Sequence, residues 1–179
     1  ITAQGNPYIF RTAFGQSASF PKLARYINSK AKTLSVIYQN NDFGKGGRDT
    51  LVKLLAGGPT KIVSEVATDQ GQIDFSAAVL KARQAGADAL FVYLTEEESA
   101  RALREIRKQG YDKPIIGETV LISQKVIDMA PASLTAGGMA TALSQSFTVF
   151  QVKKWNSIML RPATAIRHSG RAANSSGAP

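Results

Sequence analysis

The sequence contains no cysteine and a single histidine, His168, among its 179 residues. Without thiols there are no disulfides, thiolate zinc sites or cysteine nucleophiles. The absence of cysteine does not, however, identify the cellular compartment. No apolar run approaches the roughly 18 residues needed to span a bilayer. The first residues also lack the basic start and apolar middle of a signal peptide. We therefore expect either that the mature protein begins elsewhere or that it is not exported.

Acidic residues are fewer than basic ones, 13 against 22, which gives a net charge of +9. This excess is unevenly distributed, because residues 144–179 hold five basic residues and no acid, leaving 17 basic against 13 acidic elsewhere. The remaining basic stripe consists of Arg101, Arg104, Arg107 and Lys108. It has no interleaved aromatic residues, so it favours a solvated helix face over a nucleic-acid site. We expect no nucleic-acid partner.

The stretch from Leu34 to Gly47 organises the rest of the chain. Its apolar first part, Leu34 to Tyr38, is rich in the β-branched and bulky residues that fill a buried strand. Asn40 to Gly47 is polar and contains glycines, which is typical of a loop. Leucines at helical spacing follow from Arg48 to Ala56. The pattern predicts strand, loop and helix.

The same alternation continues along the chain. Further strands are expected at residues 61–67, 90–94, 114–118 and 138–143, and helices starting near Ser19, Asp74, Thr95 and Ser123. Thr95 and Glu98 have the spacing of a capping box, and Pro21 is expected in the first turn of its helix. Alternating strands and helices predict an α/β fold, a three-layer sandwich with a mostly parallel sheet and helices on both faces.

Ligands of open α/β sheets bind beyond the carboxyl ends of the strands. Residues 40–43, 94–97 and 117–120 follow three expected strands and carry polar groups suited to a small ligand. The chain is expected to divide into an α/β ligand-binding lobe, 1–143, and a basic, partly flexible tail, 144–179, which has no sustained period. The first half of this tail, to about Leu160, is able to fold against the lobe.

Several motifs for chemistry are incomplete. Gly44 to Gly47 lacks the Ser or Thr that follows the Gly-Lys pair of a phosphate loop. Gly15 to Ser19 ends in Ser where a nucleophile elbow needs Gly. His168 lies in the unpatterned tail, and Glu96 to Glu98 suit a helix N-terminus better than a metal site. We expect a protein that is not an enzyme and that uses no cofactor or metal.

Several segments together resemble the type I periplasmic solute-binding proteins of ABC transporters, in the branched-chain amino-acid (Leu/Ile/Val) binding group. The resemblance extends over residues 5 to 143 and rests on the order and spacing of Pro7–Thr12, Val36–Gly44, Asp74–Ser76, Ala87–Val92, Leu103–Gly110 and Ala136–Gly138. It implies a Rossmann-like lobe, the second of the two lobes between which such proteins enclose their ligand. The chain is then about half of a receptor.

The resemblance also implies roles for individual residues. Phe43 matches the aromatic residue that closes on the ligand, and Glu118 matches the acid that pairs with the ligand's α-ammonium group. Thr95 and Glu96 fall where the family places another ligand-facing residue. Gln16 stands where relatives often have an acid near the hinge. From position alone, Glu118 also fits a solvated loop acid, and Phe43 also fits a plug for the core beneath its loop.

The resulting hypothesis is the solute-binding component of an ABC import system. It implies an amino acid or similar small molecule as ligand, a membrane permease as partner of the full-length protein, and a periplasmic location. One alternative is a cytoplasmic ligand-sensing regulator on the same fold, similar to amide sensors; another is an α/β enzyme without the usual signatures. We also expect weak or no ligand binding by this chain. We further expect either self-association through the exposed interlobe face or coverage of that face by residues 144–160.

Overall fold

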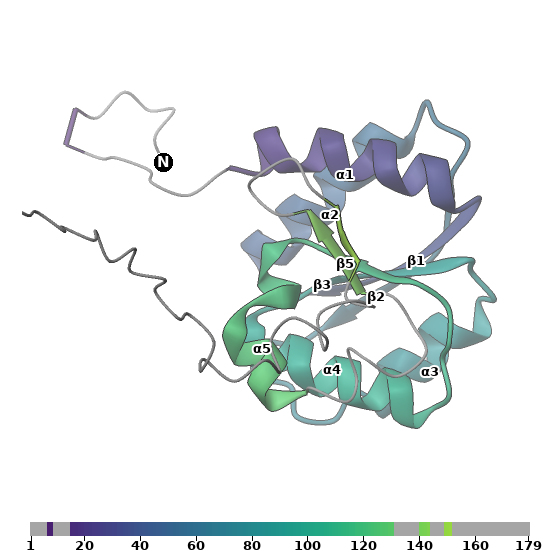
Figure 1. The fold of residues 1–179 in the computed structure, drawn as a ribbon, viewed down its shortest axis with the longest axis vertical. Coiled ribbons are helices and arrows are strands. Elements are labelled where there is room, and N and C mark those ends of the chain that lie inside the picture. Colours follow the sequence, from purple (N-terminus) through teal and green to yellow (C-terminus); the bar gives the residue numbers. More distant parts are fainter. Residues whose placement is uncertain (1–6, 9–14, 131–139, 144–148, 152–179) are drawn as a thin grey trace, which may run out of the picture.

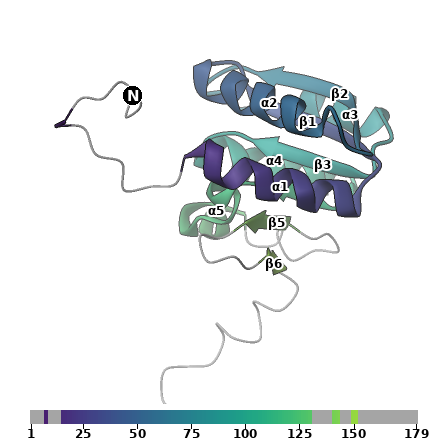
Figure 2. The same cartoon turned by 90° about the horizontal axis from the view of Figure 1, so that it is seen from above.

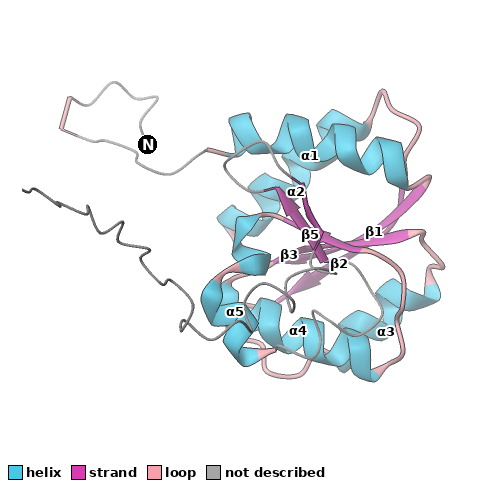
Figure 3. Cartoon of the chain, viewed as in Figure 1, coloured by secondary structure: helices cyan, strands magenta, loops and turns pink. Residues whose placement is uncertain are grey.

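The computed structural model of the chain describes residues 7–8, 15–130, 140–143 and 149–151. Helices and strands alternate along these residues (Figure 3). In chain order they are α1 (Gln16–Lys30), β1 (Thr33–Gln39), α2 (Asp42–Leu55), β2 (Lys61–Thr68), α3 (Ser76–Gln84), β3 (Ala89–Tyr93), α4 (Glu96–Lys108), β4 (Ile115–Gly117), the 3₁₀ turn η2 (Thr119–Ile122), α5 (Gln124–Met129), β5 (Ala140–Leu143) and β6 (Val149–Gln151).

The strands form one sheet in the order β2-β1-β3-β4-β5-β6. Figure 2 shows β2, β1, β3, β5 and β6 following one another in this order. The pairs from β2 to β5 are parallel, and β6 pairs antiparallel with β5. Helices α1 and α2 cover one face of the sheet, and α3, α4 and α5 cover the other (Figure 1). This three-layer α/β arrangement confirms the predicted fold class.

The core lies on both sides of the sheet, because β1 and β3 alternate their buried side chains between its faces. Val36 and Phe91 pack toward α1 and α2, whereas Ile37 and Val92 pack toward α3 and α4. The largest fully buried side chains are Phe20, Leu23, Ile27, Leu34, Ile37, Leu51, Phe75, Leu90, Phe91, Leu94, Leu103 and Ile106. Continuous burial of this kind explains the apolar runs in the sequence.

The stretch after β1 differs from its predicted structure. Residues 42–47 form the first turns of α2, not a loop, and Asn41 caps the helix by accepting a hydrogen bond from the Gly44 N–H at 2.9 Å. A Cβ on Gly44 would lie 1.9 Å from the Gln39 carbonyl oxygen, and one on Gly47 would lie 2.2 Å from the Tyr93 ring. These glycines therefore permit close packing of α2 on the sheet; they do not form a turn.

Helix α1 also starts earlier than predicted. It begins at Gln16, with Gly15 as its N-cap, so Pro21 lies inside the helix, beyond its first turn. Pro21 is exposed, while Phe20 and Leu23 on either side of it are buried. Since proline lacks an N–H, the Ser17 carbonyl loses its usual helical partner at this point. The earlier start brings Gln16 and Ser19 into the first turn of a helix.

Two predictions concern the ends of the chain. The predicted last strand is present as β5, whereas β6 lies beyond residue 143, where no strand was predicted. The division into a lobe and a tail at that residue remains a prediction, and the segments 9–14, 131–139 and 152–179, including His168, lie outside the described residues. Among the helices that the structure describes, none has the length and apolar character required to cross a membrane.

Candidate ligand site at the carboxyl edge of the sheet

The carboxyl ends of β1, β3 and β4 meet at one edge of the sheet, because these strands are parallel neighbours. Asn41 and the first turn of α2 follow β1, Thr95 and α4 follow β3, and Glu118 follows β4. The first turn of α1 reaches the same edge through a hydrogen bond from Gln16 to Tyr93, the last residue of β3. The three strand ends named by the sequence therefore lie together, as predicted.

An aromatic pair forms one part of this edge. The Phe43 ring stacks on the Tyr93 ring, with centroids 4.5 Å apart and planes inclined by 21°. Phe43 is 41% exposed, whereas Tyr93 is 2% exposed. Phe43 is therefore neither a core plug nor a freely solvated side chain. The exposed face of the Phe43 ring is apolar, and its other face packs on the Tyr93 ring.

Two hydrogen bonds join the first turn of α1 to this edge. The Gln16 amide Nε2 donates to the Tyr93 hydroxyl at 2.7 Å, and the Ser19 hydroxyl donates to Glu118 Oε1 at 2.7 Å. Burial raises the pKa of Tyr93 above its ordinary value of 10.0, the hydrogen bond from Gln16 opposes this rise, and the charge of Glu118 adds to it. Glu118 is thus a half-buried, hydrogen-bonded carboxylate near Tyr93.

Thr95 and Glu96 have a different setting from the other three predicted residues. They line a hollow of about 270 Å³ on the α4 side of the sheet edge. The remaining lining residues are Gly71, Glu97, Glu98, Arg101 and Lys125. The structure thus gathers Gln16, Phe43 and Glu118 around Tyr93, and it places Thr95 and Glu96 beside a second, charged hollow. Whether any of the five contacts a ligand remains a prediction.

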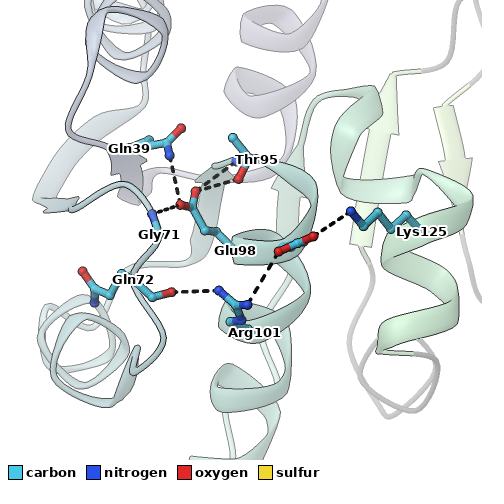
Figure 4. A network of polar contacts seen from close by, with 8 residues as sticks. Gln39, Gly71, Gln72, Thr95, Glu98, Arg101 and Lys125 are labelled. Atoms are coloured by element: carbon cyan, nitrogen blue, oxygen red, sulfur yellow. Dashed lines mark hydrogen bonds and ion pairs between the residues drawn. The ribbon is translucent and has the colours of Figure 1, made fainter.

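The buried carboxylate of Glu98 ties together the loops around this hollow (Figure 4). Its Oε1 atom accepts hydrogen bonds from Gln39 Nε2 at 3.0 Å and from the Gly71 N–H at 2.5 Å. Its Oε2 atom accepts from the hydroxyl of Thr95 at 2.8 Å and from the Thr95 N–H at 3.4 Å. The predicted capping box is present, and Glu98 also bridges the ends of β1, β2 and β3.

Ion pairs border the hollow on its outer side. Lys125 Nζ lies 2.7 Å from Glu97 Oε1, and Arg101 lies 3.6 Å from Glu97 Oε2 (Figure 4). The hydrogen bond and charge of Lys125 lower the pKa of Glu97, and the same contact raises the pKa of Lys125. Since these side chains are about half exposed, their contribution to stability is small. The Lys125–Glu97 pair attaches α5 to the start of α4, whereas the Arg101–Glu97 pair lies within α4.

The basic stripe on α4 is exposed at Arg104 and Lys108, as predicted, and half-buried at Arg101 and Arg107. Arg101 donates to the Gln72 carbonyl, Arg104 to the Met129 carbonyl and Arg107 to the Tyr111 carbonyl. Burial lowers the pKa of Arg107. These three guanidinium groups connect α4 to neighbouring segments, so the arginines of the stripe have a structural role. Within the described part of the chain, no group of three or more His, Cys, Asp or Glu residues is placed to hold a metal ion.

The sequence patterns missed Tyr93, Ser19 and the bridging role of Glu98. Tyr93 ends an apolar strand and looked like another core residue. Its partner Gln16 lies 77 positions away, and Ser19 lies 99 positions from Glu118. Contacts between residues so far apart in the sequence cannot be predicted from local periodicity. The one sequence feature that could have indicated them is the position of these residues at ends of strands and helices that share one edge of the sheet.

Comparisons with known proteins agree with this architecture. The profile of the family described as "Periplasmic binding protein" matches residues 2–148, most of the chain. The chain belongs to the periplasmic binding protein family. The resemblance inferred from the sequence is thereby confirmed, and the match ends five residues beyond the predicted boundary at 143.

Curated relatives of this periplasmic binding protein chain include three amino-acid-binding proteins. It is 29% identical over 120 residues to the "Leu/Ile/Val-binding protein homolog 3" of Brucella melitensis, covering 65% of this chain and 32% of the relative. It is 26% identical over 145 residues to the "Leucine-specific-binding protein" of Salmonella typhimurium, covering 80% of this chain and 38% of the relative. It is 24% identical over 149 residues to the "Leucine-, isoleucine-, valine-, threonine-, and alanine-binding protein" of Pseudomonas aeruginosa, covering 82% of this chain and 39% of the relative.

Solved structures show the same fold. The branched-chain amino acid transporter substrate-binding protein LivJ of Streptococcus pneumoniae, in complex with isoleucine, superposes with a TM-score of 0.69 at 24% identity over 80% of this chain and 41% of its own. The leucine-binding protein LivK of Thermotoga maritima superposes with a TM-score of 0.67 at 21% identity, over 78% of this chain and 39% of its own. This periplasmic binding protein chain therefore spans between 32% and 41% of the length of the curated and solved relatives named here.

Proposed function

We propose that this chain forms one lobe of the solute-binding component of an ABC import system, and that its carboxyl edge contacts a branched-chain amino acid or a similar small molecule. One observation carries the proposal: Glu118, held by Ser19, stands at the same sheet edge as the exposed ring of Phe43. A fixed carboxylate suits an ammonium group, and an exposed aromatic face suits an aliphatic side chain.

The remaining parts of the proposal follow from the family. A binding protein needs no catalytic group, so we propose that the protein is not an enzyme and has no cofactor. The full-length protein would act in the periplasm and deliver its ligand to a membrane permease, with closure of two lobes coupling the two events. The names of the relatives, which describe amino-acid-binding proteins, support this assignment. Fractionation of cells that express the full-length protein tests the location.

A thermal-shift screen of the chain tests the ligand. Leucine, isoleucine and valine at tens of millimolar should raise the melting temperature, because a ligand that binds only the native state stabilises it by mass action. Two leucine analogues separate the contacts: 4-methylpentanoate lacks the ammonium group, and 3-methylbutylamine lacks the carboxylate. If Glu118 holds the ammonium, the amine should retain part of the shift and the acid should lose it.

Two variants make this screen specific. Glu118→Gln removes the charge with little change in shape and should abolish the shift caused by leucine. Glu65→Gln is the matched control, because Glu65 lies on the edge strand β2 and pairs with Arg48; it should respond to leucine as the unmodified chain does. Equal leucine shifts in the unmodified chain and in Glu118→Gln would contradict the proposed role of Glu118.

A further inference from the structure

Tyr93 is the residue on which the predicted ligand edge converges. Phe43 stacks on its ring, Gln16 donates a hydrogen bond to its hydroxyl, and the charge of Glu118 acts on that hydroxyl. These are three of the five residues assigned to the ligand from the sequence, and they come from α2, from α1 and from the segment after β4. Tyr93 itself is 2% exposed, so it cannot offer a ligand more than a trace of surface.

The position of the Tyr93 ring is fixed by its surroundings. Phe20 meets the ring edge-on with centroids 5.5 Å apart, and Phe91 stacks at 5.9 Å. Gly47 contributes by having no side chain, since a Cβ there would lie 2.2 Å from the ring. A ring held in this way by α1, α2 and β3 has little freedom to move. The exposed ring of Phe43 therefore rests on a rigid support.

The hydroxyl of Tyr93 determines how the Gln16 amide is oriented. A phenolic hydroxyl oxygen has lone pairs that can accept a hydrogen bond from an amide N–H. Gln16 then donates through Nε2, as the structure has it at 2.7 Å. Its carbonyl oxygen Oε1 is left as an acceptor. Ser19, in the same first turn of α1, binds Glu118, so Gln16 and Glu118 both make contacts at this turn.

We propose that Tyr93 is a positioning residue of the ligand edge, seating the Phe43 ring and orienting Gln16 so that a carbonyl oxygen accompanies the Glu118 carboxylate. The edge then offers a donor-rich ligand two acceptors and one apolar surface. A primary ammonium group on an aliphatic skeleton satisfies all three. The inference rests on the proposed function for its ligand, but the orientation of Gln16 is testable without any ligand.

The ligand-free test compares Tyr93→Phe with Tyr38→Phe by NMR. Tyr38 is the register partner of Tyr93 on β1 and packs in the same core, so it is a matched deletion of one hydroxyl. In the unmodified chain the Gln16 side-chain amide protons should be shifted from their solvent-exposed position, with Gln16→Ala identifying their signals. Tyr93→Phe should move them to the solvent position, and Tyr38→Phe should not. An unchanged Gln16 signal in Tyr93→Phe would overturn the proposal.

The ligand test is a double-mutant cycle titrated with leucine. Tyr93→Phe should weaken leucine binding about 3- to 10-fold, the effect of losing one oriented hydrogen bond. In a Gln16→Ala background the same substitution should have almost no effect, because the two act through one contact. Equal losses in both backgrounds would show a merely structural role and refute positioning. If neither chain nor variants respond to leucine, the proposed function fails, and the Gln16 signal still decides the role of Tyr93.

Discussion

At the scale of single residues, two glycines of the same helix carry opposite consequences. In Gly47→Ala the new methyl group would overlap the Tyr93 ring, so we expect a loss of about 1–3 kcal/mol in the free energy of unfolding. In Gly46→Ala a Cβ meets nothing within 4 Å, and the better helix former should gain about 0.5–1 kcal/mol. Urea unfolding measures both. A neutral Gly47→Ala would mean that Tyr93 moves easily.

Asp88 makes stability depend on pH at the opposite edge of the sheet. Hydrogen bonds from Thr33, through its side chain and its N–H, and from the Lys32 N–H lower the pKa of Asp88 below its ordinary 3.8. A lowered folded-state pKa means that this stabilisation is present above about pH 3.8 and is lost as the pH falls through the folded value.

The matching experiment uses Asp88→Asn. Its urea midpoint should lie below that of the unmodified chain at pH 7, and the difference should shrink as the pH is lowered past 3.8. Asp112→Asn removes an exposed carboxylate, so it is the control and should change the midpoint little at either pH. A difference for Asp88→Asn that persists unchanged at low pH would assign its effect to packing instead of ionisation.

At the scale of elements, Glu98 holds the ends of three strands together from the first turn of α4. Glu98→Gln keeps the size of the side chain but replaces an acceptor oxygen with a donor, leaving either Gln39 and Gly71 or Thr95 without an acceptor. We expect a loss of about 1–3 kcal/mol in the free energy of unfolding. Glu96→Gln, on a half-exposed neighbour, should stay within about 0.5 kcal/mol. Equal urea midpoints would show that the bridge contributes nothing.

The elements also show how far sequence patterns reach. The strand around Val36 and the capping box of α4 were predictable, because buried runs and caps are local signals. The start of α2 was not predictable, because Asn40 to Gly47 has the composition of a turn. Glycine is needed at 44 and 47 because a side chain there would overlap Gln39 and Tyr93, which local sequence does not reveal. The place of Phe43 and Glu118 at the shared edge was predictable because both follow strands. Their ligand roles came from the family resemblance and remain predictions. The contacts of Gln16 and Ser19 depend on packing between distant segments.

At the scale of the whole molecule, the chain spans less than half of the relatives named above. If those relatives enclose their ligand between two lobes, this chain provides one side of the enclosure. We therefore expect it to bind leucine more weakly than micromolar, because half of the contacts and the exclusion of water are lost. Isothermal calorimetry decides this, and micromolar affinity in a monomer would contradict it.

Association is the other property of the whole chain that can be measured. An exposed interlobe face predicts either self-association or coverage of that face by residues 144–160. Light scattering should accordingly show dimers or larger species, or limited proteolysis should show protection of residues 144–160. A monomer whose residues 144–179 are all cleaved rapidly would contradict both. Because the net charge is +9, measurements at low and physiological salt separate apolar association from charge repulsion.

The strand order also has a consequence for local opening of the fold. β1 lies between β2 and β3, and almost all of its residues are buried, whereas β2 is an edge strand whose alternate residues are exposed. Amide hydrogens of β1 and β3 should therefore exchange with deuterium last, through global unfolding, and outward-pointing amides of β2 should exchange early. The residue that supports the ligand edge, Tyr93, ends one of these slowest strands. Its part of the site would then persist through every partial opening of the fold.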